Sequence, residues 1–186
     1  MRSWVTSITL LLSVATPLNA QRTALEFGAH PFTIQLPNGY GLLAEASPNP
    51  SFKFVTFASA WRPDHTLALI EIALVDMAAA PEGPANLAEE TLQAVRAHLT
   101  EWQQGDSTVQ VNGVTARRIT WSGSEPRSGD QREVAASVKR GVLIVGTRES
   151  IAFVLQAYDV EPHAGSTLPQ LERALMSFSL VPRRAR

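Results

Sequence analysis

The most apolar part of the chain after its N-terminal run lies at 133–158 and reads EVAASVKRGVLIVGTRESIAFVLQAY. A single polar segment, Thr147 to Ser150, divides it into two runs of strand length. Runs this apolar are typical of strands in the middle of a sheet that is covered on at least one face. The pattern therefore predicts a central pair of long strands joined by a turn, and it requires covering elements elsewhere in the chain.

Shorter strands are predicted where apolar and polar residues alternate. Phe32, Ile34 and Leu36 share one face of such a segment, and Pro37-Asn38-Gly39 after it is a turn sequence. Glu71 lies inside another strand and is expected to face solvent. Further strands are predicted at 25–28, 41–46, 52–58 and 66–75, whereas 21–24 is expected to be frayed, 47–51 to be a proline-containing loop, and 78–84 to be a linker.

A hairpin is predicted around Asn112-Gly113, the strongest short-range signal for a tight turn between two strands. Its arms are expected at 107–111 and 114–121, and neither face of the second arm is wholly apolar. The Gly- and Ser-rich segment 122–130 that follows is expected to be an exposed loop.

The first helix is predicted to begin after Asn86, with Glu89 completing a capping box, and to end near Trp102. Apolar residues recur at helical spacing in this segment, which predicts a helix packed on a sheet: Ala88, Leu92, Val95, Leu99 and Trp102.

A second helix is predicted after Thr167 as N-cap, with Pro169 in its first turn, where a missing N–H costs little. Its apolar stripe consists of Leu168, Leu171, Leu175 and Phe178. The two helices are the expected covers of the central strands.

Residues 1–20 have the three parts of a secretory signal peptide: the cation Arg2, a short apolar run, and the small residue Ala20 after a proline. The apolar run is shorter than the roughly 20 residues that a bilayer-spanning helix needs. Cleavage after Ala20 would leave one α+β domain at 21–181 and a basic tail at 182–186, with no transmembrane segment. We therefore expect a periplasmic or secreted protein.

Composition excludes several functional classes. Without Arg2 the chain has 15 basic and 17 acidic residues, and this near-neutral balance argues against nucleic-acid binding. The absence of cysteine excludes thiolate catalysis, disulfides and cysteine-ligated zinc. The G-x-S-x-G, Walker and G-x-G-x-x-G patterns are also absent, so no catalytic residue and no cofactor site is predicted.

Metal-ligand spacing is not found among the four scattered histidines. Asp64-His65 and the alternating loop residues Asp159, Glu161 and His163 have the right side-chain types for a surface metal. Hydrophilic loops contain such residues by chance, so no metal site is predicted.

The segment Trp61-Arg62-Pro63-Asp64-His65 is the most functional-looking loop of the chain. Exposed tryptophan and arginine dominate binding hot spots, so Trp61, Arg62, Asp64 and His65 are the candidate partner-binding residues. The alternative interpretation is that Trp61 folds back and covers the edge of the core.

The order of elements resembles the PsbP/Mog-type α/β/α sandwich. The resemblance rests on FTIQLP at 32–37, the Asn-Gly hairpin, the two long strands and a last helix ending in ALMSF at 174–178. DcrB-like bacterial lipoproteins and related envelope proteins share this layout, although the lipid-attachment cysteine of the DcrB-like pattern is absent here. The resemblance implies an antiparallel sheet covered by helices and a family of accessory or protein-binding modules rather than enzymes; it assigns a role to no residue.

Together these observations predict a non-catalytic accessory or protein-binding module of the bacterial cell envelope, with a protein partner. The alternative is a carrier of a small ligand or metal that uses the Trp61–His65 loop.

Overall fold

The structure is a computed structural model that describes residues 21–27, 30–79, 83–126 and 137–181. The predicted signal peptide and basic tail lie outside these ranges, as do parts of the predicted 78–84 linker and of the 122–130 loop.

The centre of the fold is a seven-stranded sheet in which every neighbouring pair is antiparallel. The strand order is β3-β4-β5-β9-β8-β7-β6, so the two apolar strands predicted from the sequence occupy its middle, as expected. The strands are β3 (Gly41–Asn49), β4 (Phe52–Ala58), β5 (Leu69–Asp76), β6 (Thr100–Val111), β7 (Val114–Ser124), β8 (Val138–Arg148) and β9 (Ile151–Val160).

A smaller sheet of order β1-β2-β10 lies beside the large one; it consists of β1 (Gln21–Phe27), β2 (His30–Leu36) and β10 (Ser179–Leu180). The expectation that 21–24 is frayed is wrong, because β1 pairs with β2 along its whole length, from Gln21 opposite Leu36 to Phe27 opposite His30. The predicted Pro37-Asn38-Gly39 turn is confirmed, with Gly39 at a φ of 79°.

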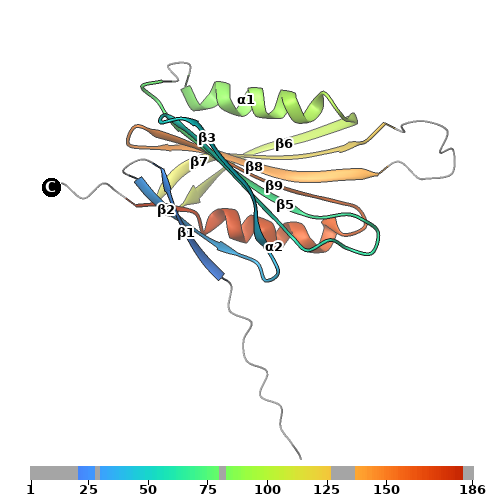
Figure 1. Cartoon of the computed structure of the whole chain (residues 1–186). Coiled ribbons are helices and arrows are strands. Elements are labelled where there is room, and N and C mark those ends of the chain that lie inside the picture. Colours follow the sequence, from blue (N-terminus) through green and yellow to red (C-terminus); the bar gives the residue numbers. More distant parts are fainter. Residues whose placement is uncertain (1–20, 28–29, 80–82, 127–136, 182–186) are drawn as a thin grey trace, which may run out of the picture.

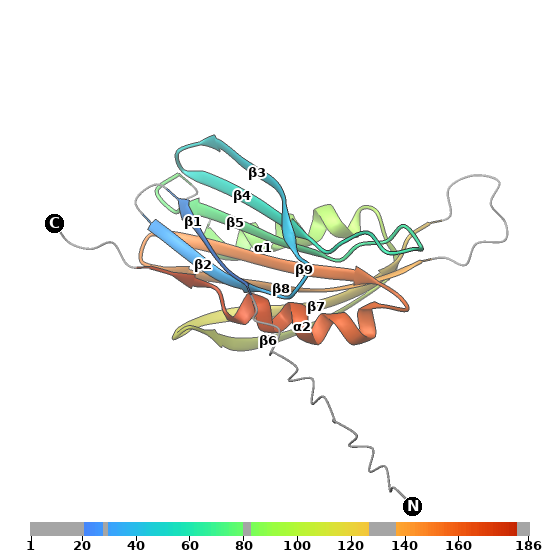
Figure 2. The same ribbon diagram turned by 60° about the horizontal axis from the view of Figure 1, so that its bottom comes forward.

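The large sheet is covered on both faces (Figures 1 and 2). Helix α1 (Gly83–Arg96) packs on one face against Ile119, Leu143 and Val154. Helix α2 (Ala164–Met176) and the small sheet cover the other face, where Phe153 and Leu155 belong to the larger core. Side chains alternate between the two faces along β9, so this strand contributes to both cores. The predicted α/β/α sandwich is confirmed. No helix of the described ranges is long and apolar enough to cross a membrane.

The first helix was predicted with the wrong ends. It begins at Gly83 and stops at Arg96, and Asn86 hydrogen-bonds Glu90 within the helix instead of capping it. Trp102 lies in β6, where its ring stacks on Trp121 with centroids 5.6 Å apart. The apolar stripe is nevertheless continuous, because Leu99 and Trp102 pack in the same cluster as Leu92.

Three smaller expectations are corrected. The loop predicted at 47–51 is largely strand, since β3 continues to Asn49 through an irregular register. The second helix begins a turn early, at Ala164 after His163, which leaves Thr167 inside it. Glu71 does not face open solvent; it is half-buried on the α1 face of the sheet, and burial raises the pKa of its carboxyl group.

Candidate functional site

The loop between β4 and β5, which contains the candidate partner-binding residues, is held together by its own hydrogen bonds. The N–H of Arg62 donates to the carbonyl of Thr66 at 3.0 Å, and the N–H of His65 donates to the carbonyl of Arg62 at 2.9 Å. At the base of the loop, the N–H of Ser59 donates to the carbonyl of Ala68, also at 3.0 Å. The loop is therefore an ordered extension of the β4–β5 hairpin.

Arg62 fastens this loop to the end of β9. Its guanidinium donates two hydrogen bonds to Asp159, at 2.7 and 2.8 Å, and the side chain of Asp159 is fully buried. Burial opposes ionisation of Asp159, but hydrogen bonds from Arg62, Thr167 and the N–H of Val160 outweigh it and lower the pKa of this carboxyl group. The Arg62–Asp159 pair is therefore ionised at neutral pH and acts as an internal clamp.

Asp64 provides a second attachment. Its carboxylate accepts hydrogen bonds from the hydroxyl and the N–H of Thr66 and lies 2.7 Å from Nε2 of His163, just before α2. The hydrogen bonds from Thr66 and His163 lower the pKa of Asp64 to about 2. Two side chains predicted to bind a partner are thus engaged within the protein.

Trp61 projects into solvent: its exposed fraction is 71%. The alternative interpretation, in which Trp61 covers the edge of the core, is therefore wrong. His65 is also exposed and has a φ of 61° in the left-handed region, which holds it at the tip of the loop. Of the four candidate residues, Trp61 and His65 face outwards, and Arg62 and Asp64 fix the loop that presents them.

Two further apolar side chains lie at the same end of the sheet and were not singled out from the sequence. Strand β3 begins opposite the end of β4, with Gly41 paired to Ala58, and Leu42 and Leu43 are 55% and 60% exposed. The Leu42-Leu43 pair on an edge strand is the signal that could have revealed them.

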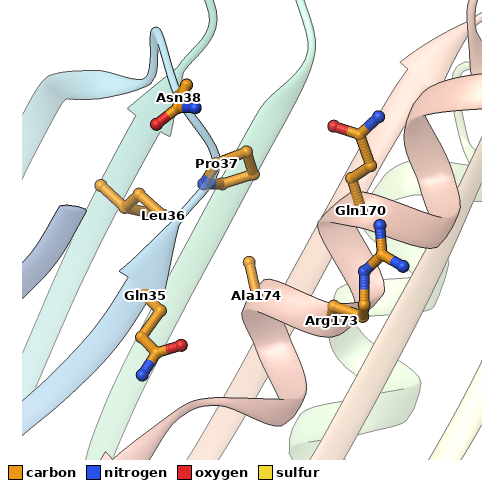
Figure 3. Close-up of a pocket in the computed structure, with 7 residues that line it drawn as sticks. All are labelled: Gln35, Leu36, Pro37, Asn38, Gln170, Arg173 and Ala174. Atoms are coloured by element: carbon orange, nitrogen blue, oxygen red, sulfur yellow. The ribbon is translucent and has the colours of Figure 1, made fainter. Parts of the chain in front are cut away.

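A groove runs between the turn after β2 and helix α2, with a volume of about 430 Å³ (Figure 3). Gln170 and Arg173 of α2 lie across from Leu36, Pro37 and Asn38. Arg173 is exposed and forms no ion pair with any described residue. The groove is thus polar on the α2 side and carries one uncompensated positive charge.

Tyr40 lies between this groove and the loop. It follows the turn after β2, and the charges of Arg62 and Asp159 act on its hydroxyl. Burial, with a contribution from Asp159, raises the pKa of Tyr40 to about 12. The hydroxyl therefore stays neutral over the physiological range.

The possible metal ligands of the two loops are brought only partly together. Asp64 contacts His163, but Asp159 forms an ion pair with Arg62, and Glu161 forms one with Arg140 at 2.9 Å. In the described ranges, no group of three or more acidic or histidine side chains is arranged to hold a metal.

The Asp64–His163 pair has the first two parts of a hydrolytic triad but no attached nucleophile in the described part of the chain. The hydroxyl of Ser166 donates to the main-chain carbonyl of His163 and that of Thr167 donates to Asp159, and the described contacts place neither on the ring of His163. The geometry therefore serves to attach the loop.

Comparison of whole structures finds solved proteins of similar architecture, among them the following two. LpqN of Mycobacterium tuberculosis, described as involved in cell envelope biogenesis, aligns over 87% of this chain and 91% of its own, with a TM-score of 0.51 and 16% identity. The cyanobacterial PsbP of Synechocystis sp. PCC 6803 aligns over 90% of this chain and 96% of its own, with a TM-score of 0.57 and 11% identity.

The chain has a PsbP-like fold. This confirms the resemblance inferred from the order of elements, and at such identities the likeness concerns the fold alone. No protein-family model matches the sequence, and no curated protein does.

Proposed function

We propose that this PsbP-like protein is an exported, non-catalytic module of the bacterial cell envelope that binds another protein through Trp61. The observation that carries the proposal is the 71% exposure of Trp61 on a loop held by the Arg62–Asp159 and Asp64–His163 pairs. Exposed tryptophan is among the residue types that dominate binding hot spots, and this one stands on a loop that is fixed in place.

The held loop favours affinity. Ordering a mobile loop on binding costs free energy, and a loop that is already fixed avoids most of this cost. Leu42 and Leu43 are further exposed apolar side chains at this end of the sheet, and the exposed Arg173 in the groove beside the turn after β2 offers a charge able to pair with an acidic group of a partner.

Cellular location is supported by the predicted signal peptide and by the cell-envelope role stated for LpqN. Mass spectrometry of the protein purified from its own envelope fraction tests it. A mature N-terminus at Gln21 is the expected result, and an intact Met1 in a cytoplasmic fraction would refute export.

Partner binding is tested by placing a photo-crosslinking phenylalanine derivative at position 61 in living cells of the source bacterium. We expect one discrete adduct, whose partner is then identified by mass spectrometry. The matched control carries the same derivative at Arg96, an exposed residue in the last turn of α1 on the opposite layer. Equal adducts at both positions, or none at position 61, would contradict the proposal.

Carriage of a small ligand or metal by the same loop has less support. Arg62 and Asp64, which would be its polar ligands, already have partners inside the protein.

A further inference from the structure

The groove between β2 and helix α2 exists because strand β10 is short (Figure 3). β10 has two residues and pairs with β2 only as far as Thr33. Beyond Thr33, no strand of the described ranges lies on this side of β2, and α2 lies across the groove instead. The volume of about 430 Å³ falls within the roughly 300–1,000 Å³ of ligand pockets, so the groove can hold a small organic molecule.

Both walls of the groove are held in place. The N–H of Gln35 donates to the hydroxyl of Ser177, at the end of α2, at 2.8 Å. The ring of the next residue, Phe178, packs in the core with its centroid 5.8 Å from that of Phe32 in β2. The helix and the strand are therefore fixed to each other at one end of the groove, and binding a ligand there requires little reordering of the protein.

The floor of the groove is apolar. Leu36 and Ala174 are 2% and 3% exposed and belong to the larger core, and the ring of Pro37 lies beside them on the strand side (Figure 3). Such a floor favours the aliphatic part of a ligand, because contact with it removes apolar surface from water.

Arg173 gives the groove its charge. It is the one charged side chain among the described lining residues, and no described residue forms an ion pair with it. The neighbouring Glu172 is already paired with Arg118 at 2.5 Å. The carbonyls at the end of α2, which could repel an anion, accept hydrogen bonds from the N–H groups of Ser177 and Phe178. The groove therefore favours an anionic ligand.

The groups around Arg173 fit a carboxylate. A guanidinium donates two parallel hydrogen bonds to a carboxylate, and its single charge balances a carboxylate better than a phosphate of charge close to −2. Gln170, three residues earlier in α2, lies on the same side of the helix and adds an amide donor.

The opposite wall offers groups for an amide. Gln35 and Asn38 are exposed, and their side-chain amides have no hydrogen-bond partner in the described part of the chain. A primary amide both donates and accepts, as a peptide group does, so the two can pair with each other. One cation, an apolar floor and facing amides together match an aliphatic carboxylate that is joined to a peptide group.

We propose that this groove binds the C-terminal carboxylate of a short peptide. Arg173 forms the ion pair with the carboxylate, and Gln170 adds a hydrogen bond. The last side chain of the peptide lies on the apolar floor, and the preceding peptide group pairs with an amide of the strand wall. This contact is separate from the one proposed through Trp61, and either proposal can fail without the other.

The experiment is isothermal titration of the purified protein with acetyl-alanyl-alanine and, separately, with its C-terminal amide, which has nearly the same shape without the charge. Binding of the acid at millimolar concentration is expected, with at least about tenfold weaker binding of the amide because the ion pair with Arg173 is lost. No heat and no rise in melting temperature with the acid would overturn the proposal. Equal binding of both compounds would overturn carboxylate recognition, and equally tight binding of sodium acetate would overturn the peptide class.

Two variants test the site itself. Arg173→Gln removes the charge and should weaken binding of the acid at least about tenfold, with binding of the amide unchanged. Gln170→Glu keeps the shape and places a carboxylate beside Arg173, where it competes with the ligand, so it too should weaken only the acid. The control Arg96→Gln removes a guanidinium from the last turn of α1 and should bind as the wild type does. Unchanged affinity in both groove variants would place binding elsewhere and refute the site.

Discussion

Asp159 shows how much of the candidate site depends on single residues far apart in the sequence. It is fully buried at the end of β9, and the Arg62 that neutralises it lies 97 positions earlier. No local pattern can reveal such a pair, because neither residue is unusual in its own segment. The sequence therefore identified the loop and named Arg62 as a candidate for partner binding, and the structure adds that Arg62 forms the internal clamp.

Replacing Asp159 by Asn should destabilise the protein by about 3 kcal/mol, since it leaves the guanidinium of Arg62 partly buried without a counter-charge. Urea denaturation at pH 7 measures this loss. Because the pKa of Asp159 is lowered in the folded state, its contribution is complete above about pH 4 and is lost as the pH falls through the folded-state pKa. The difference between variant and wild type should therefore shrink in acid.

The control for this prediction is Arg140→Gln, which breaks the more exposed pair with Glu161. Such surface pairs contribute roughly 0–1 kcal/mol, so little change is expected. Equal losses in the two variants would mean that burial does not distinguish the two pairs.

Glu71 should respond to pH in the opposite direction. Burial raises its pKa in the folded state, so ionisation of Glu71 costs stability at neutral pH, and that cost disappears as the pH falls towards its unfolded value of about 4.3. Glu71→Gln should therefore raise the melting temperature at pH 7 and lose this advantage near pH 4. Differential scanning calorimetry across this range makes the comparison, and a pH-independent difference would contradict it.

At the scale of elements, the sequence predicted the structure correctly where its pattern fits only one kind of element. The Asn112-Gly113 hairpin is confirmed, with φ values of 46° and 82° at the two turn residues. The predicted end of the first helix is wrong for a physical reason: Leu99 in the connection after α1 and Trp102 in a strand pack in the same cluster as they would from a helix. Hydrophobic spacing shows which residues are buried but not which element they belong to. The pairing of β6 with β7 places Trp102 in a strand although its spacing fits a helix.

Glycine substitutions test how Trp121 packs on strand β8. Gly141→Ala should destabilise the protein by about 1–3 kcal/mol, because the added Cβ atom collides with Trp121, whose ring must then move. Gly165→Ala is the matched control: it lies in α2 with open space around it and should stabilise the helix by roughly 0.5–1 kcal/mol. Thermal denaturation separates the two, and a neutral Gly141→Ala would mean that the indole is loosely held.

At the scale of the whole molecule, the fold was more predictable than the site. The central position of β8 and β9 follows from their apolar runs, which are local, and the two helical patterns predicted the helices that cover the two faces. The exposure of Trp61 and the partial burial of Glu71 depend on which side chains meet after folding. A half-buried carboxylate and a solvated one look the same in the sequence.

The two cores share the central strands, and this makes the sandwich a single cooperative unit. Residues of β8 and β9 alternate between the α1 core and the α2 core, so separation of these two strands disrupts both cores at once. Unfolding should therefore be two-state. In the mature protein with Trp61→Phe the remaining tryptophans, Trp102 and Trp121, report on the α1 core alone. Their fluorescence and the far-UV circular dichroism should lose signal at the same urea concentration; an earlier fluorescence transition would show that the α1 layer unfolds separately and that the central strands do not couple the two faces.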